Sequence, residues 1–334
     1  MKGYQITQFG IANLAASEMD KPQLGVRDVL VRLRTTSLNY RDLMMIDGTY
    51  NPKLKLPLVP FSDGAGEVVD IGAEVTRWKI GDRVCPTFMQ GWVDGELDYA
   101  KFKTTLGGDL DGCLREFGSF HEDGLVRIPD ALSYEEAACL PCAGVTAWNS
   151  LMVSGGLKQG ETVLLQGTGG VSMLALQFAN LAGARTIVIS SSNEKLARAK
   201  AIGADEIINY HEHEDWDSFV LDLTNKQGVD HVVEIGGAGT LARSMRAARI
   251  GGHIAVIGVV AGKGEISHVP IFMKALRVIG VFVGSSEMFE NMNAAIDRSG
   301  IRPVIDRTFG FNEVQEALRF MRSGEHFGKI VVSI

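Results

Sequence analysis

Short apolar runs alternate with segments of helix length between residues 160 and 285. The first run, ETVLLQG (161–167), precedes GGVSMLALQFANLAGA (169–184), whose apolar residues recur at helical spacing. Further apolar runs follow at 186–192, 205–210, 229–237, 253–260 and 277–284. Five or six strands separated by helices of about 10–15 residues are typical of parallel β-α-β units. This stretch therefore predicts an α/β fold with a doubly wound parallel sheet.

The rest of the chain is long enough for a second domain, because 334 residues exceed what one hydrophobic core usually fills. The net charge is −7 and no Lys/Arg cluster occurs, which argues against nucleic-acid binding. The beginning, MKGYQITQFG, has no apolar signal core, and no run of 18 apolar residues follows. We therefore expect a cytoplasmic protein that does not associate with membranes.

Two of the four cysteines form a C-x-x-C pair, Cys139 and Cys142, within SYEEAACLPCAGVTAW. A cytoplasmic protein rarely holds a structural disulfide, and a structural zinc site usually needs two close pairs. A thioredoxin-type pair would follow a strand and open a helix. Here Ser133 is the expected N-cap of a helix that Pro141 breaks or kinks. The pattern favours buried cysteines over a metal clip or a redox pair.

GTGGVS (167–172) lies directly after the first predicted strand and opens the first helix. Gly167 permits a tight turn there, and Gly169 lets the backbone approach a pyrophosphate at the helix N-terminus. Ser172 stands where a third glycine would allow close helix–strand packing, and a small serine approximates that role. Because the motif opens a series of β-α units, it predicts a dinucleotide site.

The end of the second predicted strand indicates which dinucleotide binds. NAD sites usually have Asp or Glu there, to accept a hydrogen bond from the ribose 2′-hydroxyl. This chain has Ser190, Ser191 and Ser192 instead, with Lys195 and Arg198 just beyond on one helix face. Hydroxyls and cations suit a 2′-phosphate, so we favour NADPH. The alternative is that the two cations only form a solvated helix face.

Several ordered motifs resemble the medium-chain dehydrogenase/reductase superfamily, and within it the zinc-free quinone-oxidoreductase-like branch. They are LNYRDLMMIDGTY (38–50), VPFSDGAGEVVDIG (59–72), KIGDRV (79–84), LPCAGVTAW, GTGGVS and the closing FGKIVV. The resemblance implies a GroES-like, mainly β catalytic domain, to which the C-terminal segment returns, and a Rossmann domain. We expect the catalytic domain at 1–128 and 290–334, and the dinucleotide-binding domain at 129–289.

In zinc members of this superfamily, three side chains (Cys, His, and a second Cys or His) hold the catalytic metal. The resemblance places these positions at Asn39, Ser62 and Cys142. A Glu that follows the His in zinc enzymes corresponds to Asp63. One sulfur ligand of three cannot hold Zn²⁺ in a catalytic site, so we expect no zinc.

The resemblance also implies the catalytic residues. In the quinone-reductase branch, an Asn, an Asp three residues later and a Tyr eleven residues after the Asn line the nicotinamide and substrate cleft. These are Asn39, Asp42 and Tyr50 here, whereas a further family Tyr is replaced by Met44. Tyr40 is a weaker candidate. For each tyrosine the alternative is an amphipathic filler with its hydroxyl at the surface.

The cofactor-binding residues follow from the same motifs. Residues 211–217, HEHEDWD, are interpreted as a solvated loop rather than a metal site, and Phe327 and Gly328, with the lysine after them, are expected to close the cleft. The predicted cofactor contacts are Thr146, Gly167, Gly169, Gly170, Val171, Ser191, Ser192, Lys195, Tyr210, Gly258, Val283 and Lys329.

The sequence thus predicts an NADPH-dependent, metal-free reductase that transfers hydride to a quinone, an enone or a related carbonyl compound. Two alternatives stay open: a zinc-free alcohol dehydrogenase that uses NAD in the oxidative direction, and a non-catalytic NADPH-binding protein. The branch usually pairs through an edge strand of the Rossmann sheet, here residues 277–284, so we expect a homodimer.

Overall fold

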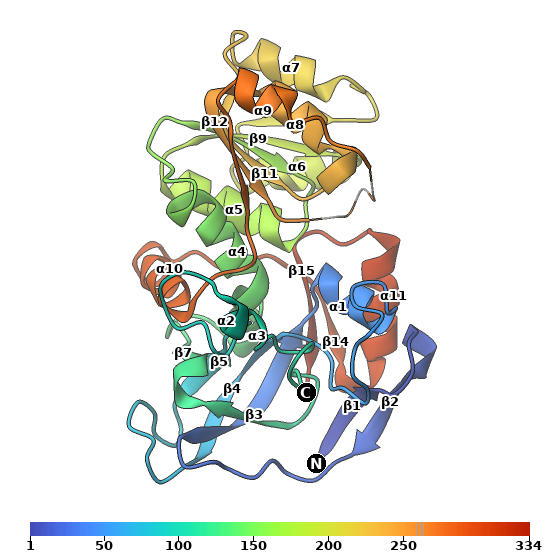
Figure 1. Cartoon of the computed structure of the whole chain (residues 1–334), viewed down its shortest axis with the longest axis vertical. Coiled ribbons are helices and arrows are strands. Elements are labelled where there is room, and N and C mark those ends of the chain that lie inside the picture. The colour runs from blue at the N-terminus through green and yellow to red at the C-terminus, as the bar shows by residue number, and fades with distance from the viewer. Residues whose placement is uncertain (259, 261, 263) are drawn as a thin grey trace. The chain divides into compact units, whose positions relative to one another are not determined.

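The computed structural model describes residues 1–258, 260, 262 and 264–334. The chain forms two compact units (Figure 1). The first comprises Met1–Val145 and Gly284–Ile334, and the second comprises Thr146–Val283. Among the described residues, no helix has both the length and the apolar character needed to cross a membrane.

The second unit contains a six-stranded parallel sheet, in agreement with the alternation of apolar runs. Its strand order is β10-β9-β8-β11-β12-β13, which becomes 3-2-1-4-5-6 when the strands are numbered within the unit. This is the doubly wound order of dinucleotide-binding folds. The strands are β8 (Thr162–Gln166), β9 (Arg185–Ser190), β10 (Glu206–Asn209), β11 (Val229–Glu234), β12 (Ala248–Val256) and β13 (Arg277–Gly280).

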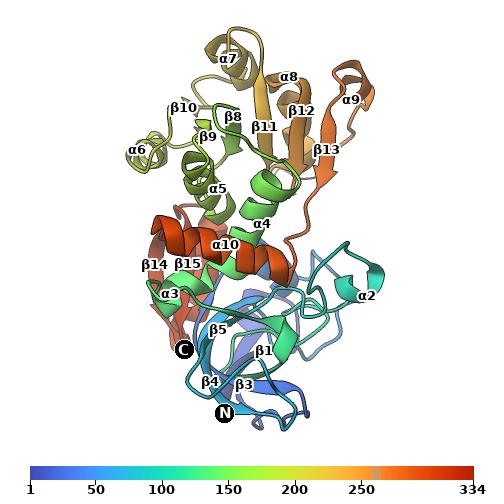
Figure 2. The same cartoon turned by 90° about the vertical axis from the view of Figure 1, so that its left-hand side faces the viewer.

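Helices pack on both halves of this sheet (Figure 2). Two lie against β8, β9 and β10, and a third lies against β11 and β12. Buried Ile, Val, Leu and Trp side chains from the strands and helices make one core. The helices are α5 (Gly170–Leu181), α6 (Asn193–Ala201), α7 (Trp216–Leu223), α8 (Leu241–Ala247) and α9 (Val269–Met273), and α4 (Val145–Trp148) precedes them in the chain.

Several predicted strand boundaries differ from the structure, and two of the differences have a clear cause. β12 begins at Ala248 rather than at residue 253, because the backbone becomes extended (φ −70°, ψ 145°) as soon as α8 ends. β13 ends at Gly280 rather than at residue 284, and Val283 has a positive φ of 57° that interrupts an extended strand. The predicted strand 253–260 includes Val259, which lies outside the described residues.

The first unit is mainly β and confirms that the C-terminal segment returns to it. Its seven-stranded sheet has the order β14-β15-β3-β4-β5-β7, β6 pairs with β3, and β1 and β2 form a separate antiparallel pair. The strands are β1 (Lys2–Ile6), β2 (Leu14–Glu18), β3 (Asp28–Ser37), β4 (Asp63–Ile71), β5 (Arg83–Pro86), β6 (Phe117–His121), β7 (Leu125–Arg127), β14 (Ile305–Gly310) and β15 (Lys329–Ser333).

The helices of the first unit bring distant segments together. The helix α11 (Val314–Ser323) buries Val314, Ala317, Leu318 and Met321, at the spacing of one helix face, in a core shared with the start of the chain. It ends at Ser323, and its C-cap Gly324 has a φ of 70°, which allows the chain to turn toward β15. The other helices are α1 (Tyr40–Ile46), α2 (Tyr99–Phe102), α3 (Tyr134–Ala138) and α10 (Ser286–Ser299).

The predicted domain boundaries assign residues 129–145 and 284–289 to the dinucleotide-binding domain, whereas the structure groups both segments with the first unit. Hydrogen bonds explain the difference. The Ser37 hydroxyl at the end of β3 donates to Ala138 O (2.8 Å), which fixes α3 to the first sheet. The Ser286 N–H donates to Trp92 O (2.9 Å), which fixes the start of α10.

Candidate functional site

The first candidate site lies where β3 ends and α1 begins. Asn39 is the N-cap of α1, and its backbone N–H donates to Asp42 Oδ2 (2.8 Å). A carboxylate in the first turn stabilises a helix N-terminus by this contact and by its charge. Both side chains are buried: Asn39 is 8% exposed and Asp42 is fully buried. The structure therefore brings these two predicted catalytic residues into contact.

Burial changes the acidity of Asp42. Desolvation raises the pKa of its carboxyl group to about 6, although the nearby Arg41 guanidinium acts in the opposite direction. The Arg41 Nη1 atom lies 3.4 Å from Asp42 Oδ1 and also donates to Leu106 O (3.0 Å). A buried carboxyl group with a pKa close to neutral is a common feature of functional sites.

A buried ion pair adjoins Asn39. Lys329, the first residue of β15, is 3% exposed, and its Nζ atom lies 3.5 Å from Oδ2 of the fully buried Asp63. The same ammonium donates to Asn39 Oδ1 (2.6 Å) and to Leu38 O (2.7 Å). Desolvation raises the pKa of Asp63, while Lys329 and hydrogen bonds from neighbouring side chains lower it.

Two serines complete this network around Asp63. The Ser37 hydroxyl lies 3.0 Å from Asp63 Oδ2, and the Ser62 hydroxyl lies 3.2 Å from Asp63 Oδ1. The Asn39 Nδ2 atom is 3.4 Å from Ser62 Oγ, which is a long contact. Asn39, Ser62, Asp63 and Lys329 thus form one buried polar cluster, which we call the Lys329 cluster.

The donor set at the metal position that the resemblance implies does not fit zinc. The Asn39 Oδ1 atom already accepts from an ammonium, and Ser62 Oγ points to a carboxylate. Burial raises the pKa of the Cys142 thiol, which opposes the thiolate form that a metal needs. Across the described part of the chain, no group of three or more His, Cys, Asp or Glu side chains is placed to hold a metal.

The C-x-x-C pair lies at the end of α3 and in a wide turn after it. α3 begins as predicted at Ser133, whose side chain accepts from the Glu136 N–H. Leu140–Gly144, which includes Pro141, forms a π-helical turn. Burial raises the pKa of Cys139 to about 12, and its thiol donates to Glu135 O (3.2 Å). A thiol of such low acidity is unsuited to disulfide exchange.

The two candidate tyrosines are more exposed than the rest of the site. Tyr50 is 41% exposed and Tyr40 is 45% exposed. The Arg41 guanidinium lies 5.6 Å from the centre of the Tyr50 ring, so Arg41 connects Tyr50 to Asp42. Desolvation raises the pKa of the Tyr50 hydroxyl, which therefore stays protonated at neutral pH. Sequence analysis did not identify the role of Arg41, since an Arg after an N-cap usually faces solvent.

In the second unit, the glycine-rich turn has the expected geometry. Gly167 has a φ of 69°, and Gly169 is the N-cap of α5, with no atom within 4 Å of the position that a Cβ would occupy. The backbone there is accessible to a ligand. Ser172 is fully buried and its hydroxyl donates to Gln166 O (2.6 Å), so it closes the helix against the strand. Gly170 and Val171 open α5.

Two buried side chains that sequence analysis missed join the ends of β8 and β11. Gln166 Nε2 donates to Glu234 Oε2 (2.7 Å), and each residue is the last of its strand. The sheet order reverses between these strands, and ligands of doubly wound sheets bind at this reversal. The Glu234 carboxylate also accepts from the N–H groups of Gly236 (2.8 Å) and Gly237 (3.0 Å).

The end of β9 carries the predicted phosphate-binding group. Ser191 is exposed, Ser192 is the N-cap of α6, and the Lys195 N–H donates to Ser192 Oγ (3.3 Å). The Tyr210 N–H donates to Ser190 O (3.1 Å), so the partly exposed Tyr210 lies beside the same strand end.

A carboxylate that sequence analysis assigned to a solvated loop lies near these residues. Glu212 Oε1 accepts from Asn193 Nδ2 (2.5 Å) and Asn209 Nδ2 (3.3 Å). Glu212 belongs to the HEHEDWD segment, and Asn193, which contacts it, is the first residue of α6. Glu212 therefore adjoins the candidate ribose position, and no spacing rule in the sequence indicated it.

Three of the remaining predicted cofactor residues lie in the second unit and one lies in the first. Thr146 is 3% exposed. Gly258 approaches the backbone of Ile235 so closely that a Cβ would lie 2.0 Å from its oxygen, which explains the glycine. The Val283 carbonyl accepts from Asn149 Nδ2 (2.7 Å). Lys329, predicted to contact the cofactor, belongs to the first unit, where its ammonium is engaged in the Lys329 cluster.

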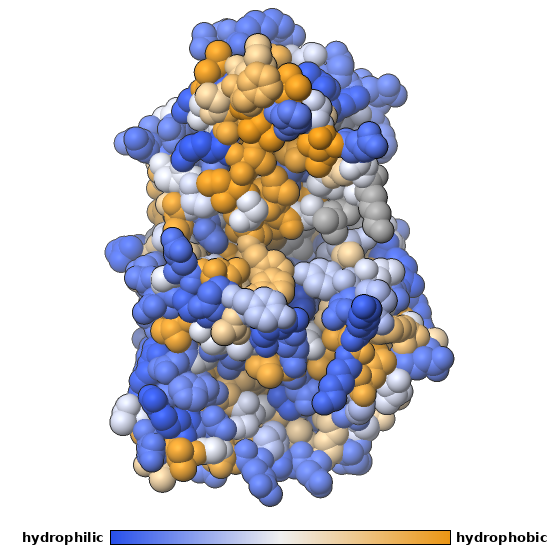
Figure 3. Space-filling model, in the orientation of Figure 1, coloured by the Kyte–Doolittle hydropathy of each residue, from blue (hydrophilic) through white to orange (hydrophobic). Residues whose placement is uncertain are grey.

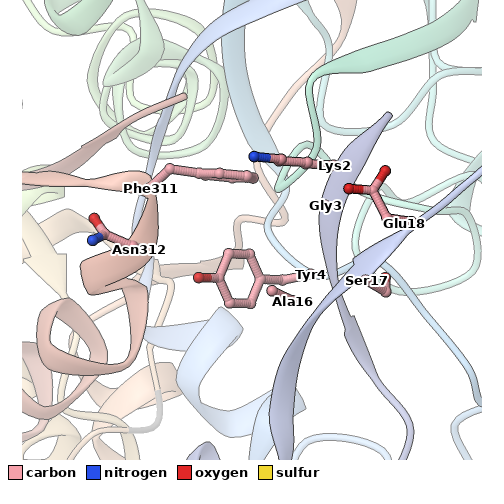
Figure 4. A pocket seen from close by; sticks show the side chains of 8 residues that line it. All are labelled: Lys2, Gly3, Tyr4, Ala16, Ser17, Glu18, Phe311 and Asn312. Atoms are coloured by element: carbon pink, nitrogen blue, oxygen red, sulfur yellow. The ribbon is translucent and has the colours of Figure 1, made fainter.

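The structure also contains a cavity of about 470 Å³ beside β1 and β2 (Figure 4). Tyr4 and Phe311 form an edge-to-face pair there, with ring centres 5.2 Å apart. None of the predicted site residues lines this cavity. Its lining residues are Lys2, Gly3, Tyr4, Ala16, Ser17, Glu18, Phe311 and Asn312.

Two family models match the chain. Residues 25–130 match the alcohol dehydrogenase GroES-like domain, and residues 170–298 match the zinc-binding dehydrogenase family. The first match supports the predicted GroES-like domain. The name of the second describes the family and not the donor set of this chain.

Similar proteins cover nearly the whole chain. A zinc-type alcohol dehydrogenase-like protein of Schizosaccharomyces pombe is 42% identical over 97% of this chain and 96% of its own length. The crystal structure of an alcohol dehydrogenase candidate from Sinorhizobium meliloti 1021 is 42% identical, with a TM-score of 0.93, over 100% of this chain and 98% of that one.

A third similarity concerns the predicted branch. The structure of the quinone oxidoreductase from Coxiella burnetii is 26% identical, with a TM-score of 0.82, over 100% of this chain and 99% of that one. Together with the doubly wound sheet and the mainly β unit, these matches show that the chain is an oxidoreductase of the medium-chain dehydrogenase/reductase superfamily, related to its alcohol dehydrogenase-like and quinone oxidoreductase-like members.

Proposed function

We propose that this chain is an NADPH-dependent, metal-free reductase that transfers hydride to a quinone, an enone or a related carbonyl compound. The observation that carries the proposal is the Lys329 cluster. Two of its members, Asn39 and Ser62, stand at positions where zinc members of the family have metal ligands, and the buried ammonium of Lys329 donates to Asn39. Without a metal, hydrogen-bond donors must stabilise the negative charge that develops on the carbonyl oxygen.

The residues of the first unit supply these donors. Asn39 Nδ2 has a long contact to Ser62 Oγ, and the Asn39 side chain also hydrogen-bonds to Asp63, so a substrate oxygen would compete with these partners for the amide donor. Tyr50 is partly exposed, and its hydroxyl, whose pKa is raised by desolvation, stays protonated and is suited to donate a proton to the reduced product. Bound NADPH supplies the hydride from its nicotinamide ring.

The residues of the second unit support the choice of cofactor. The end of β9 presents the hydroxyls of Ser191 and Ser192 and is followed by the cationic Lys195. This group favours a 2′-phosphate, because a phosphate binds cations and hydrogen-bond donors and is repelled by carboxylates. The backbone of Gly169 is open for the pyrophosphate, as the motif predicts.

The test is a substrate screen with metal analysis of the same protein. Purified, untagged protein is assayed with NADPH and NADH against quinones, enones and aldehydes, and with NAD and NADP against alcohols. We expect oxidation of NADPH by at least one quinone or enone, less than 0.1 zinc per chain (about a tenth of a stoichiometric site), and unchanged activity after chelation. One tightly bound zinc per chain, lost together with the activity, would refute the proposal.

A second candidate is a zinc-free alcohol dehydrogenase that uses NAD. Glu212 supports it, because its carboxylate adjoins Asn193 at the start of α6 and resembles the ribose acceptor of NAD sites. The name of the Schizosaccharomyces pombe relative also refers to alcohol dehydrogenases. Alcohol oxidation with NAD that exceeds NADPH-dependent reduction in the same screen would favour this candidate. Cofactor binding without turnover of any substrate would favour a non-catalytic role.

A further inference from the structure

The ammonium of Lys329 is fully engaged inside the first unit. An ammonium has three N–H donors and no acceptor. Two of its donors bind Leu38 O (2.7 Å) and Asn39 Oδ1 (2.6 Å), and Asp63 Oδ2 forms an ion pair with it at 3.5 Å. The Lys329 side chain is only 3% exposed.

This contact fixes the orientation of the Asn39 amide. The oxygen and nitrogen of an Asn side chain are distinguished only by their hydrogen-bond partners. Because an ammonium can only donate, it must face the amide oxygen, and the amide nitrogen must then face the opposite way, toward Ser62 Oγ. A side chain that could accept at this position would allow the amide to turn over and would remove the donor from the site.

The ammonium also changes the strength of the amide as a donor. A positive charge hydrogen-bonded to the amide oxygen withdraws electron density from the nitrogen, and hydrogen bonds in such chains strengthen one another in a buried environment. Asp63 holds the ammonium in place, and the Ser62 hydroxyl holds Asp63. The polarising interactions therefore connect the Asp63 carboxylate, the Lys329 ammonium and the Asn39 amide, in that order.

We propose that Lys329 is the positioning residue of this site: its ammonium orients and polarises the Asn39 amide, and so carries out electrostatically part of what a metal does in zinc relatives. The inference rests on the proposed function and deepens it. Lys329 does not touch the substrate in this arrangement. Its effect on hydride transfer passes through Asn39 Nδ2.

A double-mutant cycle tests this role. The variants are Asn39→Ala, Lys329→Met and the pair together, each assayed for kcat, for the dissociation constant of NADPH and for thermal stability. Removing one donor to a developing oxyanion typically lowers kcat by about 10²-fold or more. We expect Lys329→Met to lower kcat on the order of tenfold to a hundredfold and to change NADPH binding by less than about twofold. In the Asn39→Ala background, the same change should have no further effect on kcat.

Three controls separate positioning from folding. Lys329→Arg keeps a positive charge and should recover part of the kcat. Asn39→Asp keeps an acceptor for Lys329 but lacks the donor, so it should fold and lose activity. Lys274→Met removes an ammonium that binds the Met245, Arg246 and Ala248 carbonyls of the second unit, and it should leave kcat unchanged.

Two results would overturn the inference. One is weaker NADPH binding with normal kcat in Lys329→Met. The other is a fold-loss of kcat in the double variant that equals the product of the fold-losses in the two single variants. If the wild-type protein reduces no substrate in the screen, the proposed function fails and the inference is decided by NMR. The side-chain amide resonances of Asn39, identified by their loss in Asn39→Asp, should shift in Lys329→Met. Resonances that stay in place would refute the orientation.

Discussion

Lys195 is the residue on which the choice between NADPH and NADH depends. It follows the Ser192 N-cap by three residues, within the first turn of α6. Lys195→Ala should remove a charge-assisted contact of roughly 1.5–3 kcal/mol to the 2′-phosphate, which weakens NADPH binding about tenfold to a hundredfold. NADH lacks this phosphate, so its affinity should hardly change. The measurement is the dissociation constant of both cofactors at fixed ionic strength.

Ser191→Asp is the matched variant for the same question. Ser191 is exposed at the strand end, and a carboxylate there would accept from a ribose 2′-hydroxyl and repel a phosphate. The preference should move toward NADH. Equal weakening of both cofactors by Lys195→Ala, or equal affinities in the wild type, would show that the phosphate does not bind at this group.

A pair of buried histidines in the second unit predicts acid sensitivity. His253 is fully buried, its Nδ1 atom lies 3.4 Å from Nδ1 of His231, and the next residue in this network is Glu161, 2.9 Å from His231 Nε2. Desolvation, together with the charges of His231 and Arg277, lowers the pKa of His253 from 6.5 to about 4. Between these two values the unfolded chain binds a proton that the folded chain does not.

The free energy of unfolding should therefore fall as the pH drops from 6.5 toward 4, by up to about 1.4 kcal/mol per pH unit from this group. Above pH 6.5 the group contributes no pH dependence. Denaturant titrations of the wild type and of His253→Gln over this range give the difference in slope. If both proteins lose stability with the same slope, His253 titrates normally in the folded state.

At the scale of the elements, we expect the conformation of the loop after β11, which contains Gly236 and Gly237, to matter most for cofactor binding. Glu234 accepts from two N–H groups of this loop, from Gln166 and from Thr240 Oγ1 (2.5 Å). Glu234→Gln replaces an acceptor by an amide that must turn an N–H toward other donors, so the loop loses at least one bond. NADPH and NADH should both bind more weakly, by about tenfold.

This result is distinguishable from that of Lys195→Ala. A loop that shapes the dinucleotide site affects both cofactors alike, whereas a phosphate contact affects only one. Isothermal titration with both cofactors separates the two cases. Unchanged affinities in Glu234→Gln, with normal thermal stability, would mean that the loop keeps its conformation without the carboxylate.

The elements show what could be read from the sequence. The apolar runs identified the parallel strands because a strand buried on both faces must be apolar along its length. The glycines at the first turn identified the dinucleotide position because only glycine tolerates the φ of 69° at Gly167 at little cost. The start of β12 at Ala248 was missed, since the end of α8 carries no glycine or proline as a signal.

The polar clusters could not be read in the same way. Lys329 meets Asn39 and Asp63 only because β15 pairs with β3, which in turn pairs with β4. No local pattern indicates a contact between residues so distant in the chain. Glu234 and Glu212 were missed for a related reason: a carboxylate is usually exposed, and its burial or its partners depend on the packing of other strands. The resemblance to the family identified the candidate residues of the site, whereas their contacts became apparent only in the structure.

For the whole molecule, an exposed apolar surface on the second unit predicts self-association. α9 has no buried residue, and Val269, Phe272 and Met273 are 46%, 64% and 68% exposed. Figure 3 shows hydrophobic surface over this part of the second unit. β13, near α9 in the chain, is the last strand of the sheet, and one of its edges lacks a strand partner among the described residues. We propose that a second copy of this chain covers this surface.

The argument for a second copy is geometric and chemical. An open strand edge beside apolar side chains is suited to pair with an identical edge across a two-fold axis, because the same residues then meet on both sides. Such pairing satisfies the free N–H and C=O groups of Arg277–Gly280 and removes the phenylalanine and methionine from water.

Light scattering at micromolar concentration should give twice the mass of 36.1 kDa. Phe272→Asp should shift the protein toward the monomer by placing an unpaired charge in the interface, whereas Tyr99→Asp, at an exposed aromatic of the first unit, should leave the dimer intact. A wild-type monomer under these conditions, or a dimer that Phe272→Asp leaves unchanged, would show that this surface does not mediate association.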